Sequence, residues 1–348
     1  MIFSNHFVSR FAHFLTAKMP PPPLDGWVHF RVEFSYFRKP CPLRRENGDN
    51  LPDQFQFPVN QDLVATAVGR LYPTKKGPMS INQLLRGAVR ERNSLVCVGL
   101  DVNPERMPSH VMEGGDPIFQ FNKAIIDATS DLVVAYKPNL AFYEALGAEG
   151  WDILRRTVRV IPQGILKIGD AKRGDIGSTA EQYAKALFRM GFDMVTLSPY
   201  LGFDSVNPFI QNPDKGVFIL CLTSNPGSRD FQYLESGGMA LYQHVAHKIV
   251  EWNIRDNCGL VAGATHPDEL KAIRRIAPDL PFLIPGIGAQ GGDLQAAIHA
   301  GTDARGSMAV INSSRGILYA SSGKDFAEVA RVKTEALRDS INAIRSSK

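Results

Sequence analysis

Eight short apolar runs, each followed by a segment with helical signals, make up the chain from residue 79 onward. This alternation limits the possible folds more than any other feature of the sequence. Short apolar runs bounded by glycine, proline or polar residues are typical of buried strands. The runs are Leu95–Leu100, Leu132–Tyr136, Ile165–Ile168, Met194–Leu197, Val217–Leu222, Leu260–Ala262, Phe282–Pro285 and Ser307–Ile311. Eight such repeats within about 250 residues predict an α/β fold, the (β/α)8 or TIM barrel.

Helix start and stop signals fall between these runs. Ser80 precedes an amphipathic segment as a typical N-cap, and Asp116 does the same before Pro117 at the first helical position. Asp293 opens a later helix, and Gly191 closes an earlier one. A doubly wound open sheet would also alternate, but it rarely reaches eight strands of this regularity. No G-x-G-x-x-G motif follows the first run.

Composition and charge argue against membrane and nucleic-acid partners. The chain has 348 residues, 44% of them hydrophobic, and no apolar run approaches the roughly 20 residues that span a bilayer. The net charge is +4, and residues 1–78 account for it with ten Lys and Arg against six Asp and Glu. The other 270 residues hold 29 of each. We therefore expect a soluble protein whose attraction for an anion is local.

Residues 1–78 differ from the rest of the chain. They carry ten of the 23 prolines and show no sustained period of 2 or 3.6. We interpret them as a weakly structured N-terminal extension, followed by the barrel domain over residues 79–348. The absence of acidic residues in 1–24 is similar to a transit peptide, and a true start at Met79 is an equal alternative.

The cysteines and histidines predict neither disulfides nor a metal site. No C-x-x-C spacing occurs, and three of the four cysteines lie in strand-like runs: Cys97, Cys221 and Cys258, with Cys41 outside them. This pattern is typical of reduced thiols in a cytoplasmic protein. His244 and His247 share one helix face, but no carboxylate or cysteine is placed to complete a metal site with them.

Polar residues follow several of the predicted strands. In a barrel of this type the carboxyl ends of the strands carry the chemistry, so these groups should meet in one pocket. They are Asp101, then Lys137-Pro138-Asn139, Asp170 with Lys172 and Asp175, Thr223-Ser224-Asn225, Pro285 to Gly292, and Asn312 to Gly316.

The segment Asp170 to Ile176 places a carboxylate, an ammonium and a second carboxylate in a row at the end of a buried run. Asp170 and Lys172 are two residues apart, and Asp175 follows Gly174, where the chain can turn. Buried charges are tolerated when each has a partner. A structural ion pair at a strand end is the alternative to a catalytic array.

The two loops after the last two predicted strands indicate a phosphate site. Glycines from 286 to 292 allow backbone N–H groups to approach an anion, and Gln290 adds an amide donor. Arg315 can bind a phosphate through two parallel hydrogen bonds. These glycines could instead serve only to make tight turns.

The segment from Asn225 to Gly238 is long for a loop between a strand and a helix, and it contains glycine near both ends. This predicts a lid that closes over a ligand, with a mobile surface loop as the alternative.

These motifs together resemble the orotidine 5′-phosphate decarboxylase family, in particular its members with the signature D-A-K-R-G-D-I-G-S-T. That signature begins at Asp170, and the resemblance covers about residues 79–340. Further blocks fit the family in the same order: Val98 to Asp101, Tyr136 to Asn139, Leu222 to Gly227, Pro285 to Gln290 and Ser314 to Ile317.

The resemblance implies a role for each matching residue. The catalytic residues would be Lys172, Asp170, Asp175 and Lys137. Asp101 and Lys137 would hold ribose hydroxyls, and Asn139 would assist ribose or array contacts. The other substrate-binding residues would be Ser224 at the pyrimidine edge, Pro285, and Gln290, Ser314 and Arg315 at the phosphate. Asp175, Ile176 and Thr179 would enter the site of the other subunit in a homodimer with shared active sites.

The implied reaction converts orotidine 5′-phosphate, a small-molecule substrate, to uridine 5′-phosphate and carbon dioxide in pyrimidine biosynthesis. No Schiff-base pattern, thiamine site or metal cluster is evident, so we expect no cofactor, with Lys172 stabilising and protonating the C6 carbanion. One alternative is a metal-dependent decarboxylase or aldolase-like barrel of the same superfamily, which EDTA would inactivate. Another is a non-catalytic nucleotide-binding barrel, which should lack an array residue.

Overall fold

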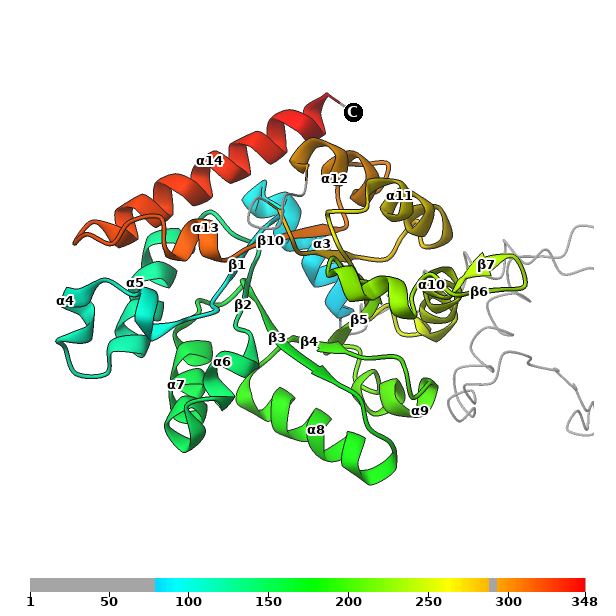
Figure 1. Ribbon diagram of the computed structural model, residues 1–348, viewed down its shortest axis with the longest axis horizontal. Coiled ribbons are helices and arrows are strands. Elements are labelled where there is room, and N and C mark those ends of the chain that lie inside the picture. Colours follow the sequence, from blue (N-terminus) through cyan, green and yellow to red (C-terminus); the bar gives the residue numbers. More distant parts are fainter. Residues whose placement is uncertain (1–78, 288–292, 348) are drawn as a thin grey trace, which may run out of the picture. The chain divides into compact units, whose positions relative to one another are not determined.

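The computed structural model describes residues 79–287 and 293–347, and within them eight parallel strands close into a barrel (Figure 1). Around the barrel the order is β1-β10-β9-β8-β5-β4-β3-β2, so strands that follow one another in the chain are neighbours. Their bounds are β1 Val96–Gly99, β2 Ala135–Lys137, β3 Leu166–Arg173, β4 Met194–Leu197, β5 Gly216–Leu222, β8 Cys258–Ala262, β9 Phe282–Ile284 and β10 Ala309–Ser313. The predicted (β/α)8 barrel is confirmed.

Helices pack around the outside of this barrel (Figure 1). The longer ones are α5 Pro117–Thr129, α7 Gly147–Val160, α8 Gly177–Met190, α10 Leu241–Trp252, α11 Pro267–Ile276, α12 Leu294–Gly301 and α14 Phe326–Ser346. Each presents an apolar face to the strands; in α14 this face includes Phe326, Ala330 and Ile341. The helix signals at Asp116-Pro117, Gly191 and Asp293 lie at the helix ends where they were predicted.

Helix α3, Ile81–Arg92, packs against the amino-terminal end of the barrel. Ser80 caps it as predicted, by accepting the N–H of Gln83 in a capping box. The N–H of Ile81 donates to the carbonyl oxygen of Pro213 at 2.9 Å, and Asn82 donates to that of Cys258 at 3.0 Å. The helix is therefore tied to the segments where β5 and β8 begin.

Strand β3 is longer than the sequence predicts. The expected strand ended at Ile168, but pairing continues to Arg173, so Asp170 and Lys172 lie on the strand itself and Asp175 follows it. The register against β4 shifts between Gly169 and Arg173, and Lys172 lies in this irregular stretch with a φ of 47°. A positive φ at a lysine cannot be predicted from residue type. The sequence therefore contains no sign that the strand continues past Ile168.

Within the described residues, no helix is both long enough and apolar enough to cross a bilayer. Cys97, Cys221 and Cys258 are buried free thiols, as predicted. Cys41 and the predicted extension over residues 1–78 lie outside the described residues.

Candidate active site

A cavity of about 340 Å³ opens at the carboxyl ends of the strands. It brings together most of the residues that the sequence singled out. Those lining it are Asp101, Lys137, Asn139, Asp170, Lys172, Ser224, Pro285, Ser314 and Arg315. They come from six of the barrel strands or from the loops directly after them, so closure of the barrel is what places them in one pocket.

Asp170 is the centre of a charged array in this cavity. One of its carboxylate oxygens, Oδ2, lies 2.9 Å from Nζ of Lys137, and the other, Oδ1, lies 2.6 Å from Nζ of Lys172. Lys137 is only 4% exposed, and its Nζ also lies 3.9 Å from Oδ1 of Asp101. Two ammonium groups thus share one carboxylate, each through its own oxygen.

The ionisation of the array follows from these contacts. Burial by itself would raise the pKa of Asp170, but the charges of Lys137 and Lys172 hold that pKa well below its usual range. Burial by itself would lower the pKa of Lys137, but Asp101 and Asp170 hold it above its usual value. Asp170 and Lys137 are therefore both charged at neutral pH.

The predicted phosphate site lies at the end of the cavity where β1, β9 and β10 meet. Arg315 begins the short helix α13, Arg315–Leu318, directly after Ser314. Gly99 lies close to Ser314, because a Cβ at position 99 would be 2.0 Å from Oγ of Ser314 and would displace that side chain. Gly286 adopts a φ of 99°, which favours glycine. Gln290 and the glycines at 288, 291 and 292 lie outside the described residues.

An apolar wall faces the charged array. It is formed by Leu220, Val261, Leu283, Pro285 and Ile287, from β5, β8 and β9 and the loop after β9. Such a wall excludes water from one side of the cavity and strengthens electrostatic interactions inside it.

Thr196 of β4 lines the cavity beside Asp170 and was missed by the sequence analysis. Asn312 near the end of β10 is buried there; it was among the strand-end polar residues expected in the pocket, but it was given no role. Oδ1 of Asn312 has no hydrogen-bond partner among the described residues. The signal for both is their position near the carboxyl end of a predicted strand. Thr196 was overlooked because a threonine in an apolar run is also an ordinary strand former.

Asp175, Ile176 and Thr179 do not line the cavity of their own chain. Oδ1 of Asp175 accepts the N–H of Ile176 at 2.8 Å. Ile176 is 56% exposed and precedes α8, in whose first turn Thr179 lies, also exposed.

The long loop after β5 is folded rather than irregular. It contains the 3-10 helix η4, Pro226–Asp230, and a small hairpin of β6, Glu235–Ser236, and β7, Met239–Ala240. The turn of the hairpin is Gly237-Gly238, both with positive φ. Gln232 holds the loop to the end of β5 by accepting the N–H of Thr223 and donating to its hydroxyl, each at 2.8 Å.

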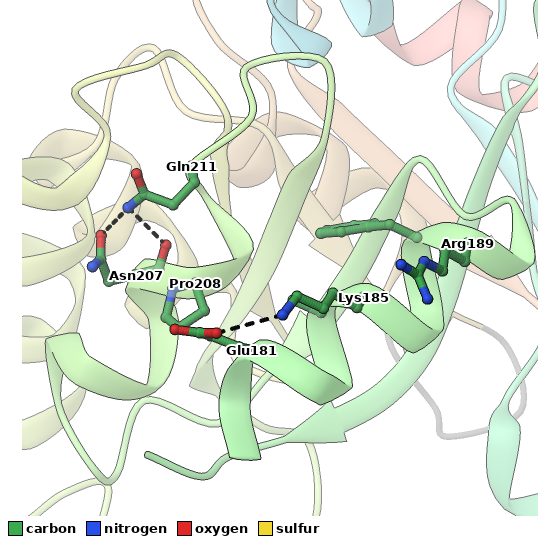
Figure 2. A pocket seen from close by; sticks show the side chains of 8 residues that line it. Glu181, Lys185, Arg189, Asn207, Pro208 and Gln211 are labelled. Carbon is green, nitrogen blue, oxygen red and sulfur yellow. Dashed lines mark hydrogen bonds and ion pairs between the residues drawn. The ribbon is translucent and has the colours of Figure 1, made fainter. Parts of the chain in front are cut away.

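A second, more open groove lies outside the barrel, between α8 and η3, Asn207–Phe209 (Figure 2). Glu181 and Lys185 form an ion pair of 3.5 Å along one side, and Gln211 donates to the carbonyl oxygen of Asn207 at 3.1 Å on the other. None of the predicted site residues lines it. Across the described part of the chain, no group of three or more His, Cys, Asp or Glu side chains could hold a metal ion.

Comparison with known proteins points to one family. Residues 94–330 match the family described as Orotidine 5′-phosphate decarboxylase / HUMPS family. A Dehalococcoides mccartyi orotidine 5′-phosphate decarboxylase is 52% identical over 272 residues, which are 77% of this chain and 99% of that protein. The corresponding Azoarcus protein is 51% identical over 264 residues, 75% of this chain and 98% of that one. The structure of Leishmania donovani OMP decarboxylase superposes with a TM-score of 0.69 at 42% identity, covering 77% of this chain and 100% of that one.

Proposed function

The chain belongs to the orotidine 5′-phosphate decarboxylase family, whose reaction it shares as a carboxy-lyase, and we propose that the array centred on Asp170 carries out the decarboxylation. The observation that carries this proposal is the shared carboxylate: Asp170 holds two ammonium groups, at 2.6 and 2.9 Å, inside the cavity at the mouth of the barrel.

The reaction needs a cation beside the reacting carbon. When the bond from C6 to the carboxylate breaks, carbon dioxide leaves and the electron pair stays on C6, in the plane of the ring, where the π system cannot delocalise it. An ammonium about 4 Å away stabilises this carbanion by about 4 kcal/mol at an effective dielectric near 20. Lys172 supplies that ammonium and then donates a proton to C6, which gives uridine 5′-phosphate.

The carboxylates keep this lysine charged and oriented. Asp170 contacts the Lys172 ammonium directly, and Lys137 anchors Asp170 from its buried side. We assign the remaining roles as the family resemblance implies them. Asp101, Lys137 and Asn139 would bind ribose hydroxyls, Ser224 and Pro285 would meet the pyrimidine, and Gln290, Ser314 and Arg315 would bind the phosphate.

The same proposal includes a homodimer with shared active sites, in which Asp175, Ile176 and Thr179 reach the partner's cavity. Exposed apolar side chains on neighbouring segments support it. Ile176 follows β3, while Tyr200, 85% exposed, and Leu201 follow the adjacent β4. Burying such side chains against a second copy is favourable.

The free buried thiols are consistent with a cytoplasmic location.

The test is the loss of orotidylate ultraviolet absorbance on adding purified protein. We expect the wild-type protein to be equally active with and without EDTA. Lys172→Ala should lower kcat by at least about 10⁴-fold, since it removes both charge stabilisation and the proton donor. Lys185→Ala, which removes an exposed lysine of the outer groove, is the matched control and should leave kcat unchanged. Activity of Lys172→Ala within tenfold of wild type would rule out its role.

A further inference from the structure

Thr196 is a polar neighbour of the charged array to which the mechanism above assigns no task. It lies in β4, next to β3, and is 1% exposed. Its Oγ1 accepts the backbone N–H of Lys172 at 2.9 Å and donates to Oδ1 of Asp170 at 3.0 Å. A hydroxyl has one proton to donate and lone pairs to accept with, so both bonds form at once.

The first of these bonds holds an unusual backbone. Lys172 has a φ of 47°, in the left-handed region that residues with a Cβ seldom adopt. Here the register between β3 and β4 is interrupted, and the N–H of Lys172 donates a hydrogen bond to Oγ1 of Thr196. Because the backbone angle sets the direction in which a side chain leaves the chain, this bond helps to decide where the Lys172 ammonium lies.

The second bond fixes the carboxylate that the ammonium contacts. Oδ1 of Asp170 receives both the Thr196 hydroxyl and Nζ of Lys172, which lies 2.6 Å away. The Lys172 side chain is half exposed and has several rotatable bonds, whereas Thr196 is buried in a strand. The hydroxyl is therefore the more rigid of the two donors.

We propose that Thr196 is a positioning residue for the decarboxylation: its hydroxyl aligns the backbone of Lys172 and the carboxylate of Asp170 together, so that the ammonium faces C6. This inference rests on the proposed roles of Lys172 and Asp170. Thr196 acts through those two residues and does not itself take part in the chemistry.

Replacing the hydroxyl by a methyl group tests the proposal. Thr196→Val keeps the branched shape and should lower kcat by about 100-fold, because small misplacements of catalytic groups have effects of that order. KM and the affinity for uridine 5′-phosphate should stay within about twofold, since the phosphate and ribose contacts lie on other strands. Thr196→Ser keeps the hydroxyl and should retain kcat within about threefold.

Ligand binding provides a second readout. In 6-hydroxyuridine 5′-phosphate the deprotonated ring carries negative charge beside C6, so it depends on a correctly placed Lys172. Thr196→Val should weaken this ligand at least tenfold and leave uridine 5′-phosphate unaffected. A merely structural role would weaken both ligands or neither. If the valine variant does not fold, Thr196→Ser and Thr196→Ala test the same point. Both lack the methyl group, and only serine keeps the hydroxyl.

Thr334→Val is the matched control. Thr334 is also fully buried, but its hydroxyl donates to the carbonyl oxygen of Ala330 within α14, so kcat should not change. The proposal is overturned if Thr196→Val retains kcat within threefold, or if serine is as impaired as valine. Lys172→Ala separates this result from the underlying mechanism. If that variant is inactive while Thr196→Val is not, only the role of Thr196 fails.

Discussion

Asp170 shows how much of the site depends on one residue. Its two oxygens are divided between a buried cation, Lys137, and a half-exposed one, Lys172, so the carboxylate is at once a structural counter-ion and part of the proposed catalytic array. Removing it would leave Lys137 buried beside Asp101 alone, at a longer distance of 3.9 Å. Loss of one partner from a buried pair is more costly than the pair itself is stabilising.

The depressed pKa of Asp170 predicts a dependence of stability on pH. A carboxyl group whose pKa is lower in the folded than in the unfolded state stabilises the fold above its unfolded pKa, near 3.9, and this contribution is lost as the pH falls toward the folded value. The free energy of unfolding of wild type minus that of Asp170→Asn should thus fall by about 1 kcal/mol between pH 6 and pH 3. Denaturant titrations of both proteins at each pH measure it. If the difference in free energy of unfolding between wild type and Asp170→Asn is constant or grows toward pH 3, the pKa of Asp170 is not lowered in the folded protein.

Arg315 lines the end of the cavity where we propose that the phosphate binds, so its substitution should affect the nucleotide differently from the nucleoside. Arg315→Ala should weaken binding of the nucleotide by roughly 10- to 100-fold, the usual loss for a hydrogen bond to a charged group. Orotidine, which lacks the phosphate, should react equally poorly with the variant and with wild type. Steady-state rates with both substrates make the comparison. Further impairment of the variant on orotidine would show that Arg315 acts elsewhere than at the phosphate.

At the scale of elements, most of the barrel could be predicted from the sequence, and the exceptions have physical causes. Met194–Leu197 was predicted with the bounds that β4 has, because polar Asp193 and Ser198 flank a purely strand-forming run. The end of β3 was missed because Gly169 and the charged residues after it resemble the end of a strand in sequence, whereas the pairing that extends β3 to Arg173 is a contact with β4. The side-chain clamp between Gln232 and Thr223 is likewise a tertiary contact with no local signal.

Arg274 of α11 gives a prediction at this scale. Its guanidinium donates to backbone carbonyls in the loop before β9, at Gly301 of α12 and at Met308 before β10, and it lies 3.5 Å from the ring centre of Phe282. Burial lowers the pKa of this arginine to about 10. One side chain therefore joins two helices to the starts of two strands, at the end of the barrel opposite the cavity.

Arg274→Met removes these donors and leaves several buried carbonyls unpaired, so it should lower the free energy of unfolding by about 3 to 5 kcal/mol. Arg274→Lys keeps the charge but loses the planar, forked arrangement of donors. Its free energy of unfolding should lie between those of wild type and Arg274→Met. Denaturant unfolding measures stability, and the KM of the remaining folded enzyme should be unchanged. A loss below about 1 kcal/mol would mean that water replaces the guanidinium at these carbonyls.

At the scale of the whole molecule, the described chain leaves part of its own predicted site outside its cavity. Lys172 and Asp170 line the cavity, while Asp175 does not, and its carboxylate accepts the neighbouring N–H of Ile176. Ile176, the next residue, and Tyr200, which follows the adjacent strand β4, are exposed apolar side chains. A second copy placed on this rim by a two-fold axis would receive Asp175 and return its own.

This arrangement predicts complementation between two inactive variants. Lys172→Ala and Asp175→Ala should each be nearly inactive alone. If they are mixed, partly unfolded and allowed to exchange subunits, a mixed dimer has one site with both substitutions and one with neither. With random pairing half of the dimers are mixed, so activity should rise to roughly a quarter of the wild-type value per site. Mass spectrometry of the intact dimers confirms exchange. Mixed dimers that form without any return of activity would show that Asp175 serves the cavity of its own chain, since only a shared site restores a complete array.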